Sequence, residues 1–367
     1  MTAGSAGSGP ATLTVGVVGA GSWGTTLAKI AGENGHETLL WARSAELCRE
    51  LNEAHSNERY LPGHRLPDRV RAVNELSSIC ERCRLILLVV PSHGLRAVAQ
   101  AIGGCLQGDQ VVVHCVKGLE VETFKRMSEV IREETCVRKI GVLSGPNLSA
   151  EIAARHPAAT LVASKFEEAI RLAQQALHCN TFRVYGGSDV VGAEVAGAFK
   201  NVVAIAAGVV DGLGLGDNTK ASLLTRSLSE MARLGAAMGA DLVTFGGMAG
   251  VGDLIATCAS PLSRNHQVGE RLARGQTIEE ITRGMFMVAE GVKTTRAVHR
   301  YAKAHGLELP IVSAVHALLY EGVSVGAAIE GLMARQIGRE FAFHRGASEG
   351  GEQGEFPGMI ISAAGER

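Results

Sequence analysis

Hydrophobic residues in the first half of the chain form short, nearly unbroken runs separated by polar or amphipathic stretches. Strands that are apolar on both faces are typical of a parallel sheet covered by helices on each side. The alternation therefore predicts a doubly wound α/β unit. We expect strands at residues 15–18, 37–42, 84–90, 110–116, 139–143, 159–162 and 182–185, and we interpret residues 61–67 as a long connection.

A different pattern begins at Asp189, after which no further strand is predicted. Residues 190–208 are apolar nearly all round a helix, which indicates the buried centre of an all-α domain, with Asp189 as the N-cap. A second long helix is expected from Asn218 or Thr219 to about Met238. The chain thus combines an α/β unit with an α-helical unit.

A glycine-rich turn follows the first strand and precedes the first helix. Its spacing, Gly19-x-Gly21-x-x-Gly24, is the dinucleotide fingerprint. Gly19 permits the tight turn, Gly21 lets the backbone approach a pyrophosphate, and Gly24 lets the helix pack closely on the strand. The helix N-terminus offers free N–H groups to the phosphates. The alternative is a glycine turn with a purely structural role.

With this motif in place, the length of 367 residues favours two domains. We expect a dinucleotide-binding, Rossmann-like domain at residues 12–188 and an all-helical substrate domain at residues 189–343. Residues 1–11 and 344–367 are expected to be disordered tails.

The end of the second strand bears on the choice of cofactor. An acidic residue at this position usually binds the ribose 2′-hydroxyl of NAD. Here Ala42 is followed by Arg43, and an arginine can pair with the 2′-phosphate of NADP. A solvated arginine at a helix start is the alternative, so NAD and NADP both stay open.

Several polar turns follow the predicted strands directly. They are the glycine turn, Ser92-His93, Lys117-Gly118 and Gly145-Pro146-Asn147. The carboxyl ends of parallel strands meet at one edge of the sheet, where open α/β sheets bind their ligands. We expect these turns to line one crevice.

Lys200 and Asn201 lie in the middle of the apolar helix. A buried lysine needs a partner, and burial lowers its pKa toward neutrality, which suits it to proton transfer. The alternative is a lysine whose ammonium group reaches the helix surface. We interpret Lys200 as a catalytic acid/base.

Two motifs further along the chain could complete a site. Asp253 could orient the lysine and the substrate, or it could be a plain N-cap. Ser263 could cap a helix whose N–H groups bind an anion, with Arg264 adding a bidentate fork for phosphate. Together these residues indicate hydride transfer involving a small phosphorylated carbonyl or alcohol.

Composition excludes some classes of partner. The net charge is −1, whereas nucleic acids and anionic membranes attract basic surfaces. The apolar run at 195–210 is interrupted by Lys200 and Asn201, which would be costly in lipid. We expect no nucleic-acid partner and no membrane insertion.

The cysteines and the N-terminus bear on metal sites and compartment. Of eight cysteines, only Cys80 and Cys83 have the spacing of a metal or redox pair, and no second pair completes a zinc site. Residues 1–11 lack the charged and apolar regions of a secretory leader. We expect no metal, and a reduced, cytoplasmic protein.

The motifs taken together resemble those of the NAD(P)-dependent sn-glycerol-3-phosphate dehydrogenases. The matching segments are 19–24, 89–93, 117–120, 144–146, 199–202, 216–220, 250–253 and 263–265, in order along nearly the whole chain. The resemblance implies reversible reduction of dihydroxyacetone phosphate to sn-glycerol 3-phosphate, a phospholipid precursor, with NAD or NADP. A homodimer is also implied.

The resemblance also implies roles for individual residues. Lys200 matches the proton donor and acceptor, and Lys117, Asp253 and Asn201 are assigned to catalysis with it. Cofactor contacts are implied for the glycine turn and for Ser22, Trp23, Arg43, Lys117, Ser149, Arg264, Val288 and Glu290. Substrate contacts are implied for Lys117, Gly145, Asn147, Lys200, Asp253, Ser263, Arg264 and Asn265.

Two alternatives remain at this point. One is another Rossmann-type dehydrogenase, acting on a small hydroxy acid or a phosphorylated sugar acid. The other is a nucleotide sensor without catalysis. A sensor would need the glycine turn, but it would not need Lys200, Asp253 and Arg264 together.

Overall fold

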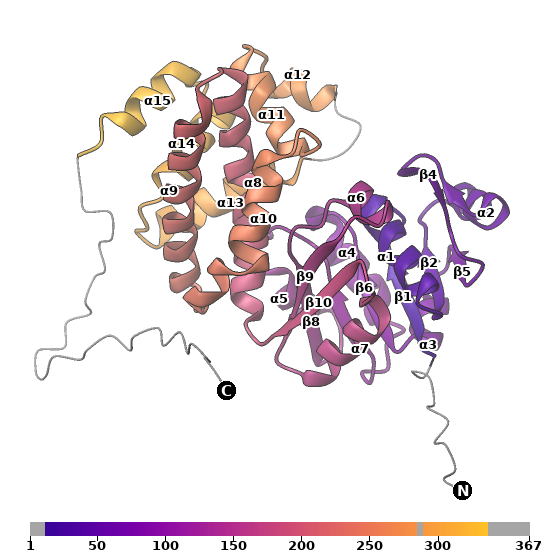
Figure 1. Ribbon diagram of the computed structural model, residues 1–367. Helices are drawn as coiled ribbons and strands as arrows, with labels where there is room; N and C mark the ends of the chain where they lie inside the picture. Colours follow the sequence, from indigo (N-terminus) through magenta and orange to yellow (C-terminus); the bar gives the residue numbers. More distant parts are fainter. Residues whose placement is uncertain (1–11, 285–288, 337–367) are drawn as a thin grey trace, which may run out of the picture.

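The computed structural model describes residues 12–284 and 289–336. Its N-terminal part is an eight-stranded sheet with the order β10-β9-β8-β7-β6-β1-β2-β5. Figure 1 shows this sheet beside a separate group of helices. The strands are β1 (Thr14–Val18), β2 (Glu37–Trp41), β5 (Val70–Val73), β6 (Leu85–Leu88), β7 (Val111–His114), β8 (Lys139–Ser144), β9 (Ala158–Ser164) and β10 (Phe182–Gly187). All seven predicted strands are present.

Two features of the sheet differ from the prediction. β9 runs antiparallel to β8, whereas every other pair in this sheet is parallel. The short helix α6 (Ser149–Ala153) does not carry the chain back along the sheet, so β9 starts at the edge where β8 ends. The expected long connection at 61–67 contains β4 (Leu61–Arg65), paired with β3 (Ser56–Asn57), and leads into β5.

Helices cover both faces of the sheet because alternate strand residues point to opposite sides. Val17 belongs to one core, with residues of α1 and α7, and Val18 belongs to the other, with residues of α3, α4 and α5. The helices are α1 (Ser22–Glu33), α2 (Ala45–Ala54), α3 (Ser77–Arg82), α4 (Leu95–Gly103), α5 (Met127–Glu134) and α7 (Glu167–Leu177). This is the doubly wound arrangement expected from the sequence.

The C-terminal part is helical. Helix α8 (Val190–Gly212) runs through its centre, and Figure 1 shows the other helices around it. They are α9 (Gly216–Ala237), α10 (Asp253–Ala259), α11 (Arg264–Ala273), α12 (Ile278–Arg283), α13 (Glu290–Ala304), α14 (Pro310–Tyr320) and α15 (Val325–Met333). α9 begins two residues before the earlier of its two predicted caps. The predicted N-cap of α8 is confirmed, because Asp189 accepts a hydrogen bond from Gly192 N at 2.9 Å.

Helix α8 is long and apolar enough to span a membrane, but 89% of its most apolar window is buried in the protein. It therefore serves as a core helix. It crosses α11 at very short range: a Cβ on Gly208 would lie 1.9 Å from His266 O, and one on Gly269 would lie 1.9 Å from Ile205 O. Only glycines fit this crossing, which fixes the first turn of α11 relative to the middle of α8.

The cysteines depart from the expectation of a fully reduced protein. Cys80, in α3, forms a disulfide with Cys105, just after α4. Cys83, its partner in the predicted spacing, is a buried free thiol, and burial raises the pKa of that thiol to about 12. The Cys80–Cys83 spacing is thus not a metal or redox pair. The tails predicted at 1–11 and 344–367 lie outside the described residues.

Candidate active site

The glycine turn joins β1 to α1. β2 lies on one side of β1 in the sheet and β6 on the other, so the strand order changes direction at β1. Gly19 has φ +122°, and a Cβ there would lie 2.3 Å from Val89 O. A Cβ on Gly24 would lie 1.8 Å from Gly19 O. Both positions therefore require glycine.

Gly21 differs, because a Cβ there would meet nothing within 4 Å. No described side chain caps the N-terminus of α1, so its first N–H groups remain available to an anion. Ser22 and Trp23 begin this helix, and Trp23 packs edge-on against Phe182, with ring centroids 6.2 Å apart. The turn thus fits the pyrophosphate of a dinucleotide.

Arg43 lies at the end of β2, where its side chain is exposed. Asn74 Nδ2 donates to the carbonyl oxygens of Ala42 and Arg43 at 2.8 and 3.0 Å. Ser44 caps α2 by accepting from Leu47 N at 3.3 Å. The backbone is therefore held while the guanidinium remains accessible.

Three predicted residues meet at one carboxylate. Asp253, the first residue of α10, accepts a hydrogen bond from Lys200 Nζ at 2.6 Å through Oδ1. Its Oδ2 accepts from Lys117 Nζ at 2.5 Å. Lys200 comes from the middle of α8, and Lys117 follows β7. The two domains thus meet at a pair of ammonium groups that share one carboxylate.

This cluster is shielded from water on the helical side. The exposed fraction is 6% for Lys200 and 1% for Asp253, whereas Lys117 is half-buried. Burial lowers the pKa of Lys200 to about 8; Asp253 acts in the opposite direction, and the positive charge of Lys117 lowers it further. Lys200 can therefore carry a proton at neutral pH and release it at little cost.

Thr257 belongs to this cluster and was missed at the sequence level. Its hydroxyl lies 2.5 Å from Lys200 Nζ and 3.2 Å from Asp253 Oδ1. The signal was its position one helical turn after Asp253, which places both side chains on the same face of α10.

The turn after β8 contributes Gly145. Its carbonyl oxygen accepts from Lys117 Nζ at 2.9 Å. Gly145 has φ +151°, and a Cβ there would lie 3.1 Å from Thr160 Cα, so a side chain would be strained. The turn therefore holds Lys117 through its backbone.

Asn147 and Ser149 lie further along the same turn. Asn147 Nδ2 donates to Thr160 Oγ1 at 3.1 Å, while its buried Oδ1 has no hydrogen-bond partner among the described residues. The carbonyl oxygen of Ser149 lies 3.5 Å from Thr26 Oγ1 of α1. Ser149 is thus near the helix that follows the glycine turn.

Asn201 and Asn265 bind each other instead of pointing separately into the crevice. Asn265 Nδ2 donates to Asn201 Oδ1 at 2.9 Å, and Asn265 Oδ1 accepts from Gly291 N at 2.9 Å. Asn201 Nδ2 also lies 3.4 Å from Lys117 O. The pair links α8, α11 and α13, so both residues support the site through these contacts.

The N-terminus of α11 has the N-cap that the sequence predicts. Ser263 Oγ accepts from His266 N at 3.3 Å, which confirms the N-cap. Arg264, the first helical residue, is exposed. The carboxylate of Glu290, at the start of α13, acts electrostatically on the Arg264 guanidinium.

Glu290 also connects the two domains. It accepts hydrogen bonds from Ser92 N at 3.2 Å and from Ser92 Oγ. The turn after β6 is thereby joined to the start of α13, beside the glycine turn. Val288, which was predicted with Glu290, lies outside the described residues.

Family models match both parts of the chain. The N-terminal domain of NAD-dependent glycerol-3-phosphate dehydrogenase matches residues 14–170, and the C-terminal domain matches residues 189–330. The chain belongs to the NAD-dependent glycerol-3-phosphate dehydrogenase family. The N-terminal match ends within α7, and the C-terminal match begins just before α8.

Individual proteins agree with this membership. The glycerol-3-phosphate dehydrogenase [NAD(P)+] of Streptomyces griseus is 47% identical over 321 residues, covering 87% of this chain and 96% of that protein. The crystal structure of glycerol-3-phosphate dehydrogenase from Coxiella burnetii aligns with a TM-score of 0.85 at 34% identity, covering 88% of this chain and 99% of that one. The Saccharomyces cerevisiae glycerol-3-phosphate dehydrogenase gives a TM-score of 0.78 at 29% identity, with coverages of 88% and 99%.

A further contact between α8 and the sheet was not predicted from the sequence. Glu194 of α8 is fully buried, and its carboxylate accepts from Arg126 Nη1 at 2.6 Å and from Ser128 N at 2.7 Å. His114 Nε2, at the end of β7, lies 3.0 Å away. Burial raises the pKa of Glu194, but His114 and Arg126 outweigh it and hold the pKa below its usual value. Glu194 thus anchors α8 to the sheet two turns before Lys200.

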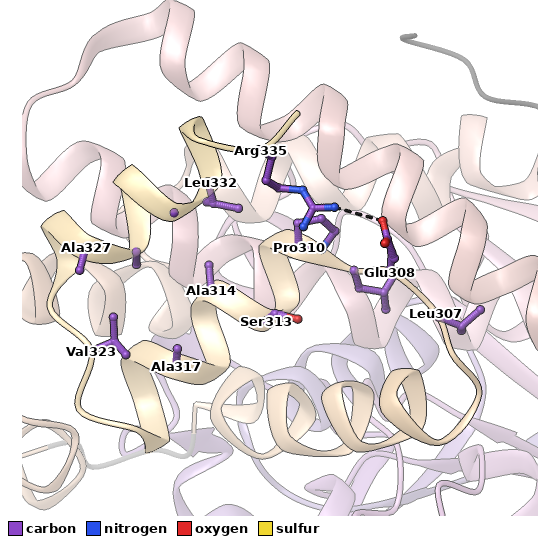
Figure 2. Close-up of a pocket in the computed structure, with 13 residues that line it drawn as sticks. Leu307, Glu308, Pro310, Ser313, Ala314, Ala317, Val323, Ala327, Leu332 and Arg335 are labelled. Atoms are coloured by element: carbon purple, nitrogen blue, oxygen red, sulfur yellow. Dashed lines mark hydrogen bonds and ion pairs between the residues drawn. The ribbon is translucent and has the colours of Figure 1, made fainter. Parts of the chain in front are cut away.

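A separate groove contains none of the predicted site residues. It lies between α14 and α15, has a volume of about 460 Å³ and is lined mainly by apolar side chains, including Pro310, Ala314 and Leu332. Figure 2 shows the ion pair between Arg335 and Glu308 at its rim. None of the catalytic candidates lines this groove.

Proposed function

We propose that this protein catalyses the reversible, NAD(P)H-dependent reduction of dihydroxyacetone phosphate to sn-glycerol 3-phosphate, a precursor of glycerophospholipids. The observation that carries the proposal is the joint contact of Lys200 and Lys117 with Asp253, where the helical part meets the segment after β7. Family membership supports it, because relatives of nearly full length bear this activity in their names.

The chain's own residues account for each requirement of the reaction. When bound, the nicotinamide cofactor supplies or accepts the hydride at C2. Lys200 holds a proton on Nζ and donates it to the oxygen at C2 as negative charge develops there, and it takes the proton back in the reverse direction. Lys117 adds positive charge next to the same position.

The phosphate of the substrate is assigned to the start of α11. Ser263 has capped one N–H group, and the remaining N–H groups and the Arg264 guanidinium provide donors for an anion. Burial lowers the pKa of the Arg264 guanidinium, and the Glu290 carboxylate acts in the opposite direction, favouring its charged form. Asn265 and Asn201 position this helix relative to Lys200, and Gly145 and Asn147 form the opposite side.

The cofactor is assigned to the glycine turn, with contacts from Ser22, Trp23, Ser149, Val288 and Glu290. Arg43 is exposed at the end of β2, where the sequence has no acidic residue to bind the ribose 2′-hydroxyl of NAD. We therefore include NADPH together with NADH as a cofactor.

We also propose a soluble, cytoplasmic homodimer. Helix α15 is apolar, yet none of its residues is buried, and Met333 is 80% exposed. Burial against a second copy would remove this surface from water. Light scattering of the purified protein distinguishes a dimer from a monomer.

The reaction is tested by mixing the purified protein with dihydroxyacetone phosphate and following oxidation of NADH and NADPH in parallel. Rapid oxidation of either cofactor, with one glycerol 3-phosphate formed per cofactor, is expected. Intact nucleotide binding without oxidation would contradict the proposal. The ratio of the two rates, compared with that of Arg43→Ala, reports the role of Arg43.

A further inference from the structure

Three side chains with metal-ligating atoms gather in the helical domain, outside the crevice. His299 comes from α13, His316 from α14, and Glu321 is the residue that ends α14. One ligand atom of each lies within 4.8 Å of the other two. Neither the proposed reaction nor the groove between α14 and α15 uses these residues.

We propose that His299, His316 and Glu321 bind a divalent transition-metal ion, with Zn²⁺ as the best-matched ion. Two imidazoles and one carboxylate form a ligand set that zinc accepts in tetrahedral geometry. Hard cations such as Mg²⁺ prefer all-oxygen sites. Since Glu321 is exposed, water can take the fourth position.

The arrangement is close to that needed for coordination. His316 Nδ1 lies 2.9 Å from Glu321 Oε1, and the rings of His299 and His316 meet edge to face with centroids 3.8 Å apart. Ligand atoms on a tetrahedral zinc ion lie roughly 3.3 Å apart. The ligand atoms, which lie within 4.8 Å of one another, would therefore have to approach by up to about 1.5 Å per pair to bind one ion.

An unsatisfied atom gives an independent reason for a ligand. His299 Nδ1 is buried and has no hydrogen-bond partner among the described residues. A buried polar atom without a partner is destabilising. A metal ion bound at this nitrogen would remove that cost.

Nearby charges do not prevent the site from forming. Lys303 and the Glu321 carboxylate both act electrostatically on His299, with opposite effects. The Arg296 guanidinium lies over the Tyr320 ring, 4.4 Å from its centroid, and is engaged there. The carboxylate supplies the negative charge that would offset a bound cation.

His299 lies 17 positions before His316 and on a different helix, whereas Glu321 follows His316 after five positions. A bound ion would link α13 to α14. α13 begins with Glu290, whose carboxylate meets Ser92 in the crevice. The metal would thus fix the far part of a helix whose first residue belongs to the cofactor site.

The test uses the untagged full chain, titrated with ZnCl2 by calorimetry and with CoCl2 by visible absorption. We expect one zinc per chain, a rise in melting temperature with zinc, and a cobalt spectrum without a thiolate charge-transfer band. Glu321→Gln should weaken zinc binding at least tenfold, and His316→Ala should abolish it. Because Glu321 is exposed, the Gln variant should fold normally.

Matched control variants are available in the same domain. His305→Ala, at the end of α13, and Glu330→Gln, on α15, change the same residue types outside the cluster and should bind zinc as the unmodified chain does. The proposal is overturned if the unmodified chain binds no zinc at 1 mM (about the weakest site that calorimetry detects). It is also overturned if Glu321→Gln and His316→Ala bind with unchanged affinity, or if cobalt gives a thiolate spectrum.

Discussion

Asp253 and Lys200 form a buried ion pair, with Oδ1 and Nζ 2.6 Å apart, across 53 positions of sequence. The second oxygen of the same carboxylate binds Lys117 from the other domain. A single carboxylate thereby compensates two ammonium groups only in part. Burial lowers the pKa of Lys200 and the charge of Lys117 lowers it further, whereas the Asp253 carboxylate limits the fall to about 8.

Asp253→Asn tests that balance. Without the carboxylate, the two ammonium groups lose their compensating charge, and the pKa of Lys200 should fall further. We expect kcat for ketone reduction at pH 7.5 to drop by about 100-fold, with the pH profile displaced to lower pH. Nucleotide affinity, measured by fluorescence titration, serves as the control, and an unmoved pH profile would count against the assigned role.

The pH dependence of the unmodified chain follows from the same residue. Ketone reduction needs the protonated ammonium, so kcat in that direction should fall as pH rises through about 8. Oxidation of glycerol 3-phosphate needs the neutral amine, so kcat in that direction should rise up to the same pH and then level off. Steady-state rates in both directions between pH 6 and 10 (roughly two units on each side) check this, and parallel profiles would be inconsistent with Lys200 as the proton carrier.

Arg264→Ala tests the phosphate assignment. Losing a guanidinium that binds phosphate should cost about 2 kcal/mol, or roughly 30-fold in kcat/KM for dihydroxyacetone phosphate. Dihydroxyacetone, which lacks the phosphate, should be reduced at an unchanged slow rate. Arg283→Ala, on the neighbouring helix α12, is the matched control. An equal loss with both ketones would show that Arg264 does not act through the phosphate.

Glu194→Gln tests the anchor between α8 and the sheet. The substitution leaves Arg126 and the end of β7 without their buried carboxylate. We expect the free energy of unfolding to fall by about 3 kcal/mol in urea titrations. Glu168→Gln, which breaks partly exposed pairs with Arg84 and Lys139, should change it by less than about 1 kcal/mol. Equal effects of the two variants would exclude a special role for the Glu194 contacts.

Much of this arrangement could be predicted from local sequence. The apolar runs predicted the strands, and the glycine spacing predicted the turn after the first of them. Both predictions were possible because a buried strand and a tight turn each permit few residue types. Lys200 stood out since a charged residue inside an apolar helix needs a partner. Asp253, the carboxylate suggested to orient it, does contact it.

The rest depended on contacts that are distant in sequence. β9 is antiparallel because the short helix α6 does not carry the chain back along the sheet before β9 begins. The Asn201–Asn265 pair depends on the close crossing of α8 and α11. The Cys80–Cys105 disulfide joins α3 to the segment just after α4, 25 positions further along the chain. Such relationships arise from packing, and no periodicity or spacing encodes them.

The most direct test of the account is the turnover of Lys200→Ala with dihydroxyacetone phosphate. Because Lys117 still compensates Asp253 in this variant, the fold and the nucleotide affinity should be retained. We predict that kcat falls by at least about 1,000-fold while the dissociation constant for NADH stays within about twofold. Turnover within about tenfold of the unmodified chain would remove Lys200 from the chemistry and contradict the account.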